Sequence, residues 1–274
     1  DTLMRPTLDA SIPLINAPAA WAALGGVEHA GQGVKVAVID TGIRPENPMF
    51  AGDGFAYPTT GGPWPKGDCE TLPGFCNGKI IAARHYNPPT GIGNTEETTP
   101  IDIDGHGSHT AATAVGRHGV TATSGAYSAQ VSGVAPEAWL MVYKGLYSDG
   151  TGGASGTTSS LAAALEDAVR DGAYVISNSW GSSPGDPTGD PTAIAAENAV
   201  AAGVVVVFSG GNSGPDAGTL GRPGNTPGVI TVAASTTGRT VTASVRLTST
   251  GVEPLEVTGA SIGAGASGPF VDAE

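Results

Sequence analysis

The 274-residue chain has few basic residues, few cysteines and no long apolar segment. No apolar run approaches the roughly 20 residues that a membrane-spanning helix needs, so we expect no membrane partner. Twelve Lys and Arg stand against 25 Asp and Glu, which gives a formal net charge of -13. Because phosphate neutralisation needs clustered basic residues, nucleic-acid binding is excluded. The N-terminal stretch DTLMRPTLDA lacks the basic start and apolar core of a signal peptide, so we expect any such peptide to be already absent.

Cysteine occurs only at Cys69 and Cys76, within a segment rich in Gly and Pro. Two thiols are too few for a structural zinc site, and we expect neither a metal nor another cofactor. Two reduced thiols are one alternative. A turn at Pro73 and Gly74 favours the other, a short local disulfide. A disulfide favours an oxidising compartment, so we expect a secreted, extracellular protein.

Apolar runs of strand length recur along the chain and alternate with helical patterns. Leu161, Leu165 and Ala168 recur at helical spacing, and Asp190 before Pro191 indicates the start of another helix. The runs that predict strands buried on both faces are Val34–Asp40, Ala138–Leu146, Tyr174–Asn178, Val204–Phe208 and Val229–Ala234. This order predicts an α/β fold with a doubly wound parallel sheet flanked by helices.

The chain divides into three parts by composition. Residues 1–33 predict an N-terminal arm with a helix near Ala17 to Leu24, and residues 34–236 hold the α/β pattern. Residues 237–274 alternate apolar and polar positions, which predicts antiparallel strands and the start of a second, β-rich domain.

The segment from Asp102 to Gly116 gathers two histidines among aspartates and glycines, and Ser108–Val115 predicts a helix that ends at Gly116. His106 then lies at the helix N-terminus, where the helix dipole disfavours a positive imidazole. An imidazole that becomes a cation during catalysis therefore needs a carboxylate partner.

Three interpretations of this segment remain open. It is a solvated polar loop, or a metal site in which His106 and His109 act with Asp102 and Asp104, or a general base at His106. The metal site would make the protein a metal-dependent hydrolase. The general base requires an orienting carboxylate and a nucleophile elsewhere.

Two further residues lie at the ends of predicted strands, where open parallel sheets carry their functional residues. Asp40 ends the first predicted strand, and Asn212 follows a run of valines in a Gly-rich turn. Either one is also explained as a turn residue. Asp-Thr-Gly is the signature of aspartic proteases as well, but those enzymes need two such carboxylates and this chain has one such motif. The topology should bring Asp40, His106 and Asn212 to one edge of the sheet.

Together these segments resemble the subtilisin-like serine proteases (subtilases). VAVIDTGI at 36–43, GHGSHTA at 105–111 and FSGGNSGP at 208–215 are similar to the aspartate, histidine and oxyanion-asparagine motifs of that family, in family order. The resemblance implies a serine endopeptidase that acts on proteins or peptides. Asp40 would orient the imidazole, His106 would be the general base, and Asn212 would stabilise the oxyanion.

The resemblance also implies an extended substrate strand held between two edges of the protein. Gly221 to Gly224 would form the far side of the first specificity pocket, and small residues on both sides imply an open pocket for a large apolar or broadly chosen side chain. The implied substrate-binding residues are Gly150, Gly152, Ser179, Trp180, Gly181, Ser209, Gly210 and Gly211.

Two features depart from the family pattern. Ser108 stands where the family more often has Thr, and no Gly-Thr-Ser-Met-Ala-like motif occurs. The run from Gly156 to Ser159 precedes Asn212, which is the wrong order for the nucleophile. We therefore expect an incomplete catalytic domain that stops before its serine, with 237–274 beginning a protease-associated type of insertion. The alternative is a catalytically dead subtilase that acts as a peptide-binding or adhesive module.

Overall fold

The computed structural model describes residues 8–90, 96, 98–124, 127–149, 153–235, 242–249 and 252–260. The chain separates into two compact units, of which the larger is Leu8–Ala234. The smaller unit contains the strands β14 (Thr242–Ser249) and β15 (Val252–Ala260), which pair antiparallel. An antiparallel pair is what the alternating sequence there predicts.

A seven-stranded sheet forms the centre of the larger unit, and its strands pair in parallel in the order β13-β11-β9-β1-β6-β3-β2. All six residues of the central strand β1 are buried, as expected for a parallel strand covered on both faces. The predicted α/β fold is confirmed. The strands are β1 (Lys35–Asp40), β2 (Lys66–Gly67), β3 (Ile80–His85), β6 (Trp139–Lys144), β9 (Val175–Asn178), β11 (Val205–Ser209) and β13 (Ile230–Val232).

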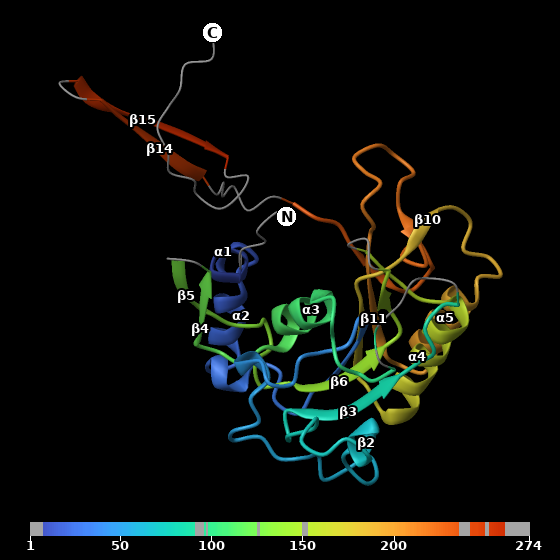
Figure 1. The fold of residues 1–274 in the computed structure, drawn as a ribbon. Coiled ribbons are helices and arrows are strands. Elements are labelled where there is room, and N and C mark those ends of the chain that lie inside the picture. The colour runs from blue at the N-terminus through green and yellow to red at the C-terminus, as the bar shows by residue number, and fades with distance from the viewer. Residues whose placement is uncertain are drawn as a thin grey trace. The chain divides into compact units, whose positions relative to one another are not determined.

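Helices cover the two faces of this sheet unequally (Figure 1). The helices α4 (Thr158–Asp171) and α5 (Pro191–Ala201) pack together on one face, where Ala37 and Ile39 of β1 share a core with both helices. On the other face, Val36 and Val38 pack with the helix α3 (His106–Val115). The side chain of Asp190 accepts a hydrogen bond from the backbone N–H of Thr192, so the predicted start of α5 is confirmed.

Part of the α3 face carries apolar side chains with large exposed fractions. Val205, Ile230 and Val232 are 45%, 52% and 51% exposed. Val205 pairs in register with Val175, which packs with the core on the α3 side, and alternation along the strands puts Ile230 and Val232 on the same face. Within the described residues, α3 covers the β1 and β6 part of this face and leaves β11 and β13 open.

Smaller elements complete the larger unit. The N-terminal arm forms α1 (Leu8–Leu14) as well as the expected α2 (Ala17–Ala23), and α1 lies against the hairpin of β4 (Val120–Ser124) and β5 (Tyr127–Val131). The sequence pattern predicts neither α1 nor the hairpin of β4 and β5. The remaining elements are three 3-10 helices, Val27–His29, Pro48–Phe50 and Asp68–Glu70, and the strand pairs β7 (Tyr147–Ser148) with β8 (Ala154–Ser155) and β10 (Ser182–Pro184) with β12 (Gly221–Arg222).

Cys69 and Cys76 are joined by a disulfide, with their Cα atoms 5.5 Å apart, and this prediction is confirmed. No helix among the described residues has both the length and the apolar character needed to cross a membrane.

Candidate active site

The candidate site lies at the carboxyl ends of the parallel strands. Asp40 is the last residue of β1, and in register it stands beside Lys144, the last residue of β6. The segment that follows β9 and the turn that follows β11 reach the same edge of the sheet. Open α/β sheets hold their ligands at this edge, because the loops there converge from several strands.

Asp40 and His106 form a hydrogen-bonded pair. Their Oδ1 and Nδ1 atoms lie 2.7 Å apart, and the Asp40 side chain is 1% exposed while that of His106 is 44% exposed. Asp40 also accepts hydrogen bonds from the backbone N–H of Thr41 at 2.7 Å and from the Thr110 hydroxyl at 3.2 Å. An ionised carboxylate only accepts, so Nδ1 carries the hydrogen and Nε2 is the basic nitrogen of the neutral ring.

The helix α3 begins at His106 itself, two residues before the predicted start. Gly105 precedes it with a φ of 99°, a conformation that favours glycine. A Cβ atom on Gly107 would lie 2.3 Å from the carbonyl oxygen of Gly42, so this turn of α3 touches the loop after β1. The glycines beside His106 therefore allow a close backbone approach that brings the ring to Asp40.

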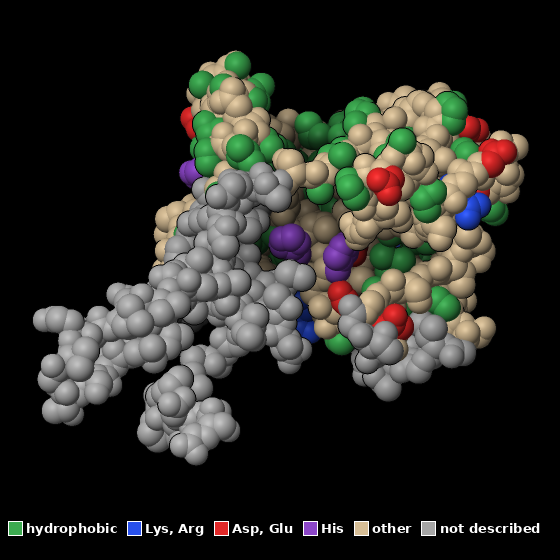
Figure 2. Space-filling view, turned by 90° about the horizontal axis from the view of Figure 1, so that it is seen from above, with side chains coloured by type: hydrophobic (Ala, Val, Ile, Leu, Met, Phe, Trp, Pro, Cys, Tyr) green, Lys and Arg blue, Asp and Glu red, His purple; other side chains and the backbone are tan. Residues whose placement is uncertain are grey.

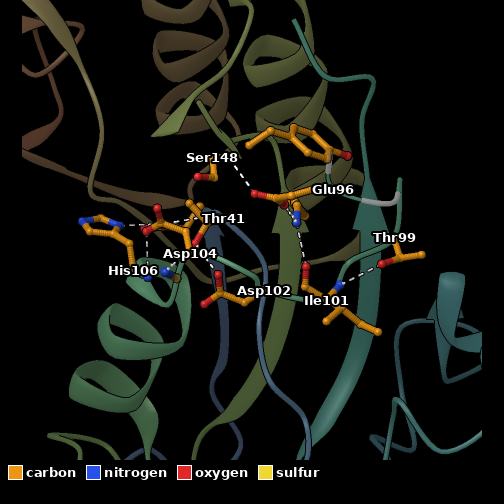
Figure 3. A network of polar contacts seen from close by, with 12 residues as sticks. Thr41, Glu96, Thr99, Ile101, Asp102, Asp104, His106 and Ser148 are labelled. Carbon is orange, nitrogen blue, oxygen red and sulfur yellow. Dashed lines mark hydrogen bonds and ion pairs between the residues drawn. The ribbon is translucent and has the colours of Figure 1, made fainter. Parts of the chain in front are cut away.

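A buried carboxylate, Asp102, fixes this helix start (Figure 3). Its Oδ1 accepts from the Thr41 hydroxyl at 2.9 Å and from the Gly105 N–H at 2.8 Å. Its Oδ2 accepts from the Ser108 N–H at 2.8 Å and from the Ser108 hydroxyl at 2.7 Å. The Thr41 hydroxyl in turn accepts from the Gly107 N–H at 2.8 Å. Asp102 thus joins the loop that carries Asp40 to the helix that carries His106.

A pocket of about 400 Å³ opens beside His106. In Figure 2, histidine side chains lie at a hollow of the surface, with acidic side chains next to it. Trp180 is 9% exposed and packs edge to face on Phe208, with ring centroids 5.0 Å apart. The lining residues are Asp104, His106, Leu146, Gly153, Ala154, Ser155, Gly156, Leu161, Ser179, Trp180, Gly181 and Asn212.

The pocket thus brings together His106, Asn212 and the segment Ser179–Gly181 from three parts of the sequence. Ser209 ends β11, and Gly210 and Gly211 follow it, outside the lining of this pocket. The Gly210 carbonyl accepts from the Gly221 N–H at 3.1 Å, so the two expected walls of the specificity pocket are neighbours. Gly150 and Gly152 lie outside the described residues.

The two histidines of α3 differ in their pKa. The hydrogen bond to Asp40 raises the pKa of His106 above its ordinary value of 6.5, because the carboxylate stabilises the imidazolium. Partial burial, and the charge of His106 nearby, lower the pKa of His109 below that value. Within the described residues, no group of three or more His, Cys, Asp or Glu side chains is placed to hold a metal ion.

We expect this difference to be measurable by carbethoxylation, a reaction of neutral imidazole. The midpoint of the rate against pH should lie above 6.5 for His106 and below 6.5 for His109, each mapped by mass spectrometry of the same digest. In Asp40→Asn, the His106 midpoint should fall while that of His109 changes little. A His106 midpoint at or below that of His109 would contradict the described pair. If His106 acts as a general base, the rate of the reaction that it catalyses should rise with pH through this raised pKa.

The site therefore combines a half-buried histidine with a buried strand-end aspartate at the edge of a parallel sheet. Comparison with known sequences gives the family. The profile of the Subtilase family (Peptidase_S8) matches residues 31–264, and the chain belongs to that family.

The relatives found are longer proteins. The chain is 37% identical over 247 residues to subtilisin-like protease SBT2.2 of Arabidopsis thaliana. This match covers 83% of this chain and 28% of that protein. Subtilisin-like protease SBT5.6 of the same plant is 39% identical over 231 residues, with 76% of this chain and 28% of that protein covered. The chain therefore spans less than a third of the length of these relatives. Among solved structures, sphericase is 30% identical, with a TM-score of 0.47 over 75% of this chain and 54% of that chain.

Sequence reasoning missed three parts of the site. The sequence indicates Asp102 only as a metal-ligand candidate, because its hydrogen bonds to Thr41 and Ser108 depend on the folded arrangement of the loop after β1 and the start of α3. The residues Gly153–Gly156 line the pocket, whereas the resemblance implies only Gly150 and Gly152 as substrate-binding residues in this part of the chain. The contacts of Glu96 had no sequence signal, because its partners lie at Lys144 and Ser148.

Proposed function

We propose that the full-length protein is a secreted serine endopeptidase in which Asp40, His106 and a serine outside these 274 residues form the catalytic triad. The observation that carries this proposal is the 2.7 Å contact between buried Asp40 and half-exposed His106 beside the pocket. Membership of a serine-protease family agrees with it. The disulfide between Cys69 and Cys76 supports secretion, because such bonds persist in oxidising compartments.

In this mechanism, Nε2 of His106 takes the proton of the serine hydroxyl while the serine oxygen attacks the carbonyl carbon of the peptide bond. Asp40 holds Nδ1–H and stabilises the imidazolium that forms. The same proton then passes to the leaving amine, and water repeats the cycle on the acyl-enzyme. Asn212 would donate its amide to the oxyanion, a contribution worth about 3 to 4 kcal/mol when one such donor is lost.

The open part of the sheet supports a nucleophile from elsewhere in the protein. Val205, Ile230 and Val232 remain half exposed on the face that α3 covers only in part. A further helix, with the serine at its start, would bury these side chains beside His106. The large size of the relatives leaves ample chain for it.

The substrate would lie as an extended strand in the pocket between Gly153–Gly156 and Ser179–Gly181. Small residues on both sides let backbone groups approach a peptide and bond to it. Substrate-binding roles for Gly150, Gly152, Ser209, Gly210 and Gly211 belong to the same proposal, as does a protease-associated type of insertion beginning in 237–274.

Labelling with a fluorophosphonate tests this proposal, because the reagent phosphonylates an activated serine oxygen and releases fluoride. We expect stoichiometric labelling of the full-length protein and none of residues 1–274 expressed alone, with the labelled peptide outside these residues. Labelling at Ser159 or Ser179 would refute the position of the nucleophile. An unlabelled full-length protein that still binds peptides would favour the alternative, a catalytically dead peptide-binding module.

A further inference from the structure

A buried ion pair lies behind the pocket wall. The Lys144 Nζ atom is 2.5 Å from the Glu96 Oε2 atom, and the two side chains are 0% and 3% exposed. Lys144 Nζ also donates to the carbonyl of Ile101 at 2.6 Å. The other Glu96 oxygen, Oε1, accepts from the backbone N–H of Ser148 at 2.7 Å. Figure 3 shows these contacts as one network next to Asp102 and His106.

One end of this network reaches the catalytic pair. Lys144 stands in register beside Asp40. The Ile101 backbone that it binds forms a bridge with Ile43 and leads directly to Asp102. Lys144 therefore holds the segment that enters the first turn of α3 and carries His106.

The other end of the network reaches the substrate side of the pocket. Ser148, whose N–H is bound by Glu96, lies in β7 and pairs with Ala154 of β8. Ala154 and its neighbours Gly153 and Ser155 line the same pocket as Ser179–Gly181. One carboxylate thus connects the backbone of the wall strand to the lysine beside Asp40.

Stability alone does not account for such a pair. Removing two charges from water costs several kcal/mol per ion, and a packed apolar pair of similar volume is often as stable. A carboxylate with two oxygens can, in contrast, bind a cation and a backbone N–H at fixed geometry. The two oxygens of Glu96 connect Lys144 of β6 to the backbone of Ser148 in β7.

We propose that Glu96 is a positioning residue, which fixes the Gly153–Gly156 wall relative to His106 and so supports the binding of extended peptides. This inference rests on the proposed function. A small reagent that reacts only at the nucleophile does not contact the wall, whereas a peptide that lies along the wall loses aligned backbone contacts when the wall shifts.

The experiment compares full-length wild type with Glu96→Gln. We expect kcat/KM for a peptide with four residues before the cleaved bond to fall about 10-fold, mainly through a higher KM. The rate of labelling by a small fluorophosphonate should change less than about 2-fold, since Asp40 and His106 keep their contact. Glu46→Gln is the matched control, because Glu46 pairs with Arg44 at 2.8 Å in an exposed position. Glu46→Gln should match the wild type both in peptide hydrolysis and in fluorophosphonate labelling.

Hydrogen exchange in the same proteins measures the opening of backbone hydrogen bonds in the wall directly. Amides of residues 147–149 and 153–156 should exchange faster in Glu96→Gln than in wild type or Glu46→Gln, while those of α4 stay unchanged. If Glu96→Gln does not fold, the double variant Glu96→Gln/Lys144→Met removes both buried charges and should show the same fast exchange. Unchanged exchange in 147–149 and 153–156, or an equal loss of rate for the peptide and the small reagent, would overturn the inference.

Failure of the proposed function would look different. An inactive, unlabelled wild type would refute the proposed peptidase activity. The role of Glu96 would then be tested by hydrogen exchange and by peptide affinity. In that case, weaker binding of the same peptide by Glu96→Gln, by about 10-fold in fluorescence polarisation, supports the role of Glu96, and equal binding refutes it.

Discussion

Replacing Asp40 by Asn in the full-length protein is expected to lower kcat/KM for peptide hydrolysis by about 10⁴-fold, the order of loss typical when the orienting carboxylate of such a triad is removed. The amide keeps the shape of the side chain but not its charge. It cannot stabilise the imidazolium, and its NH₂ group favours the tautomer of His106 with hydrogen on Nε2, which is the wrong nitrogen for a base. The loss should appear mainly in kcat, because the substrate lies on other residues.

Initial rates with a chromogenic peptide measure this effect. Asp53→Asn is a suitable control, since Asp53 is an exposed carboxylate outside the described site and should retain wild-type rates. Activity of Asp40→Asn within 10-fold of wild type would contradict the role assigned to the Asp40 and His106 pair.

Replacing Asp102 by Ala is expected to destabilise the folded protein by about 3 to 5 kcal/mol. The buried carboxylate accepts four hydrogen bonds, from Thr41, Gly105 and both donors of Ser108. Its removal leaves these donors without their acceptor, and Thr41 and Ser108 are buried. Because the same bonds hold α3 against the loop after β1, activity should also fall, with the His106 pKa moving toward its ordinary value.

The midpoint of urea unfolding, followed by tryptophan fluorescence, measures this loss. The matched control is Asp104→Ala, since Asp104 also caps the start of α3 by accepting from the His106 N–H at 3.2 Å, but is exposed. Loss of such an exposed cap should cost only about 1 kcal/mol. Equal unfolding midpoints for the two variants would show that the buried network contributes little.

The fold could be predicted because its strands carry a strong local signal. Val36 to Ile39 are apolar throughout, as burial on both faces requires. The runs at β6, β9 and β11 are also mostly apolar, although Val205 of β11 is 45% exposed. Asp40 and His106 could be predicted because each follows or begins a recognisable element, and parallel strands deliver their ends to one edge. Their contact in the structure agrees with that expectation, whereas their roles in catalysis stay proposals.

The rest of the site depends on contacts between distant residues. Nothing near Glu96 in the sequence indicates that it meets Lys144, 48 positions along the chain, in a buried ion pair. The sequence does not predict β4, because Val120 to Ser124 have little apolar character and pair with β5 in a two-stranded sheet outside the seven-stranded one. The first helix was missed because Pro13 lies inside it, and a proline is a weak indication of a helix interior.

The contacts that assemble the base lie within a short stretch of the chain. Hydrogen bonds join five residues that lie within 70 positions of one another: Asp40, Thr41, Asp102, His106 and Thr110. The strand β6, which ends at Lys144, pairs in parallel with β1. During synthesis, the N-terminal part of a chain leaves the ribosome first, and a domain generally folds as a unit. The segments that carry Asp40 and His106 are therefore synthesised before Asn212. Under the proposed function, the general base would be synthesised before the nucleophile, and peptide cleavage would begin only after the nucleophile had folded against it.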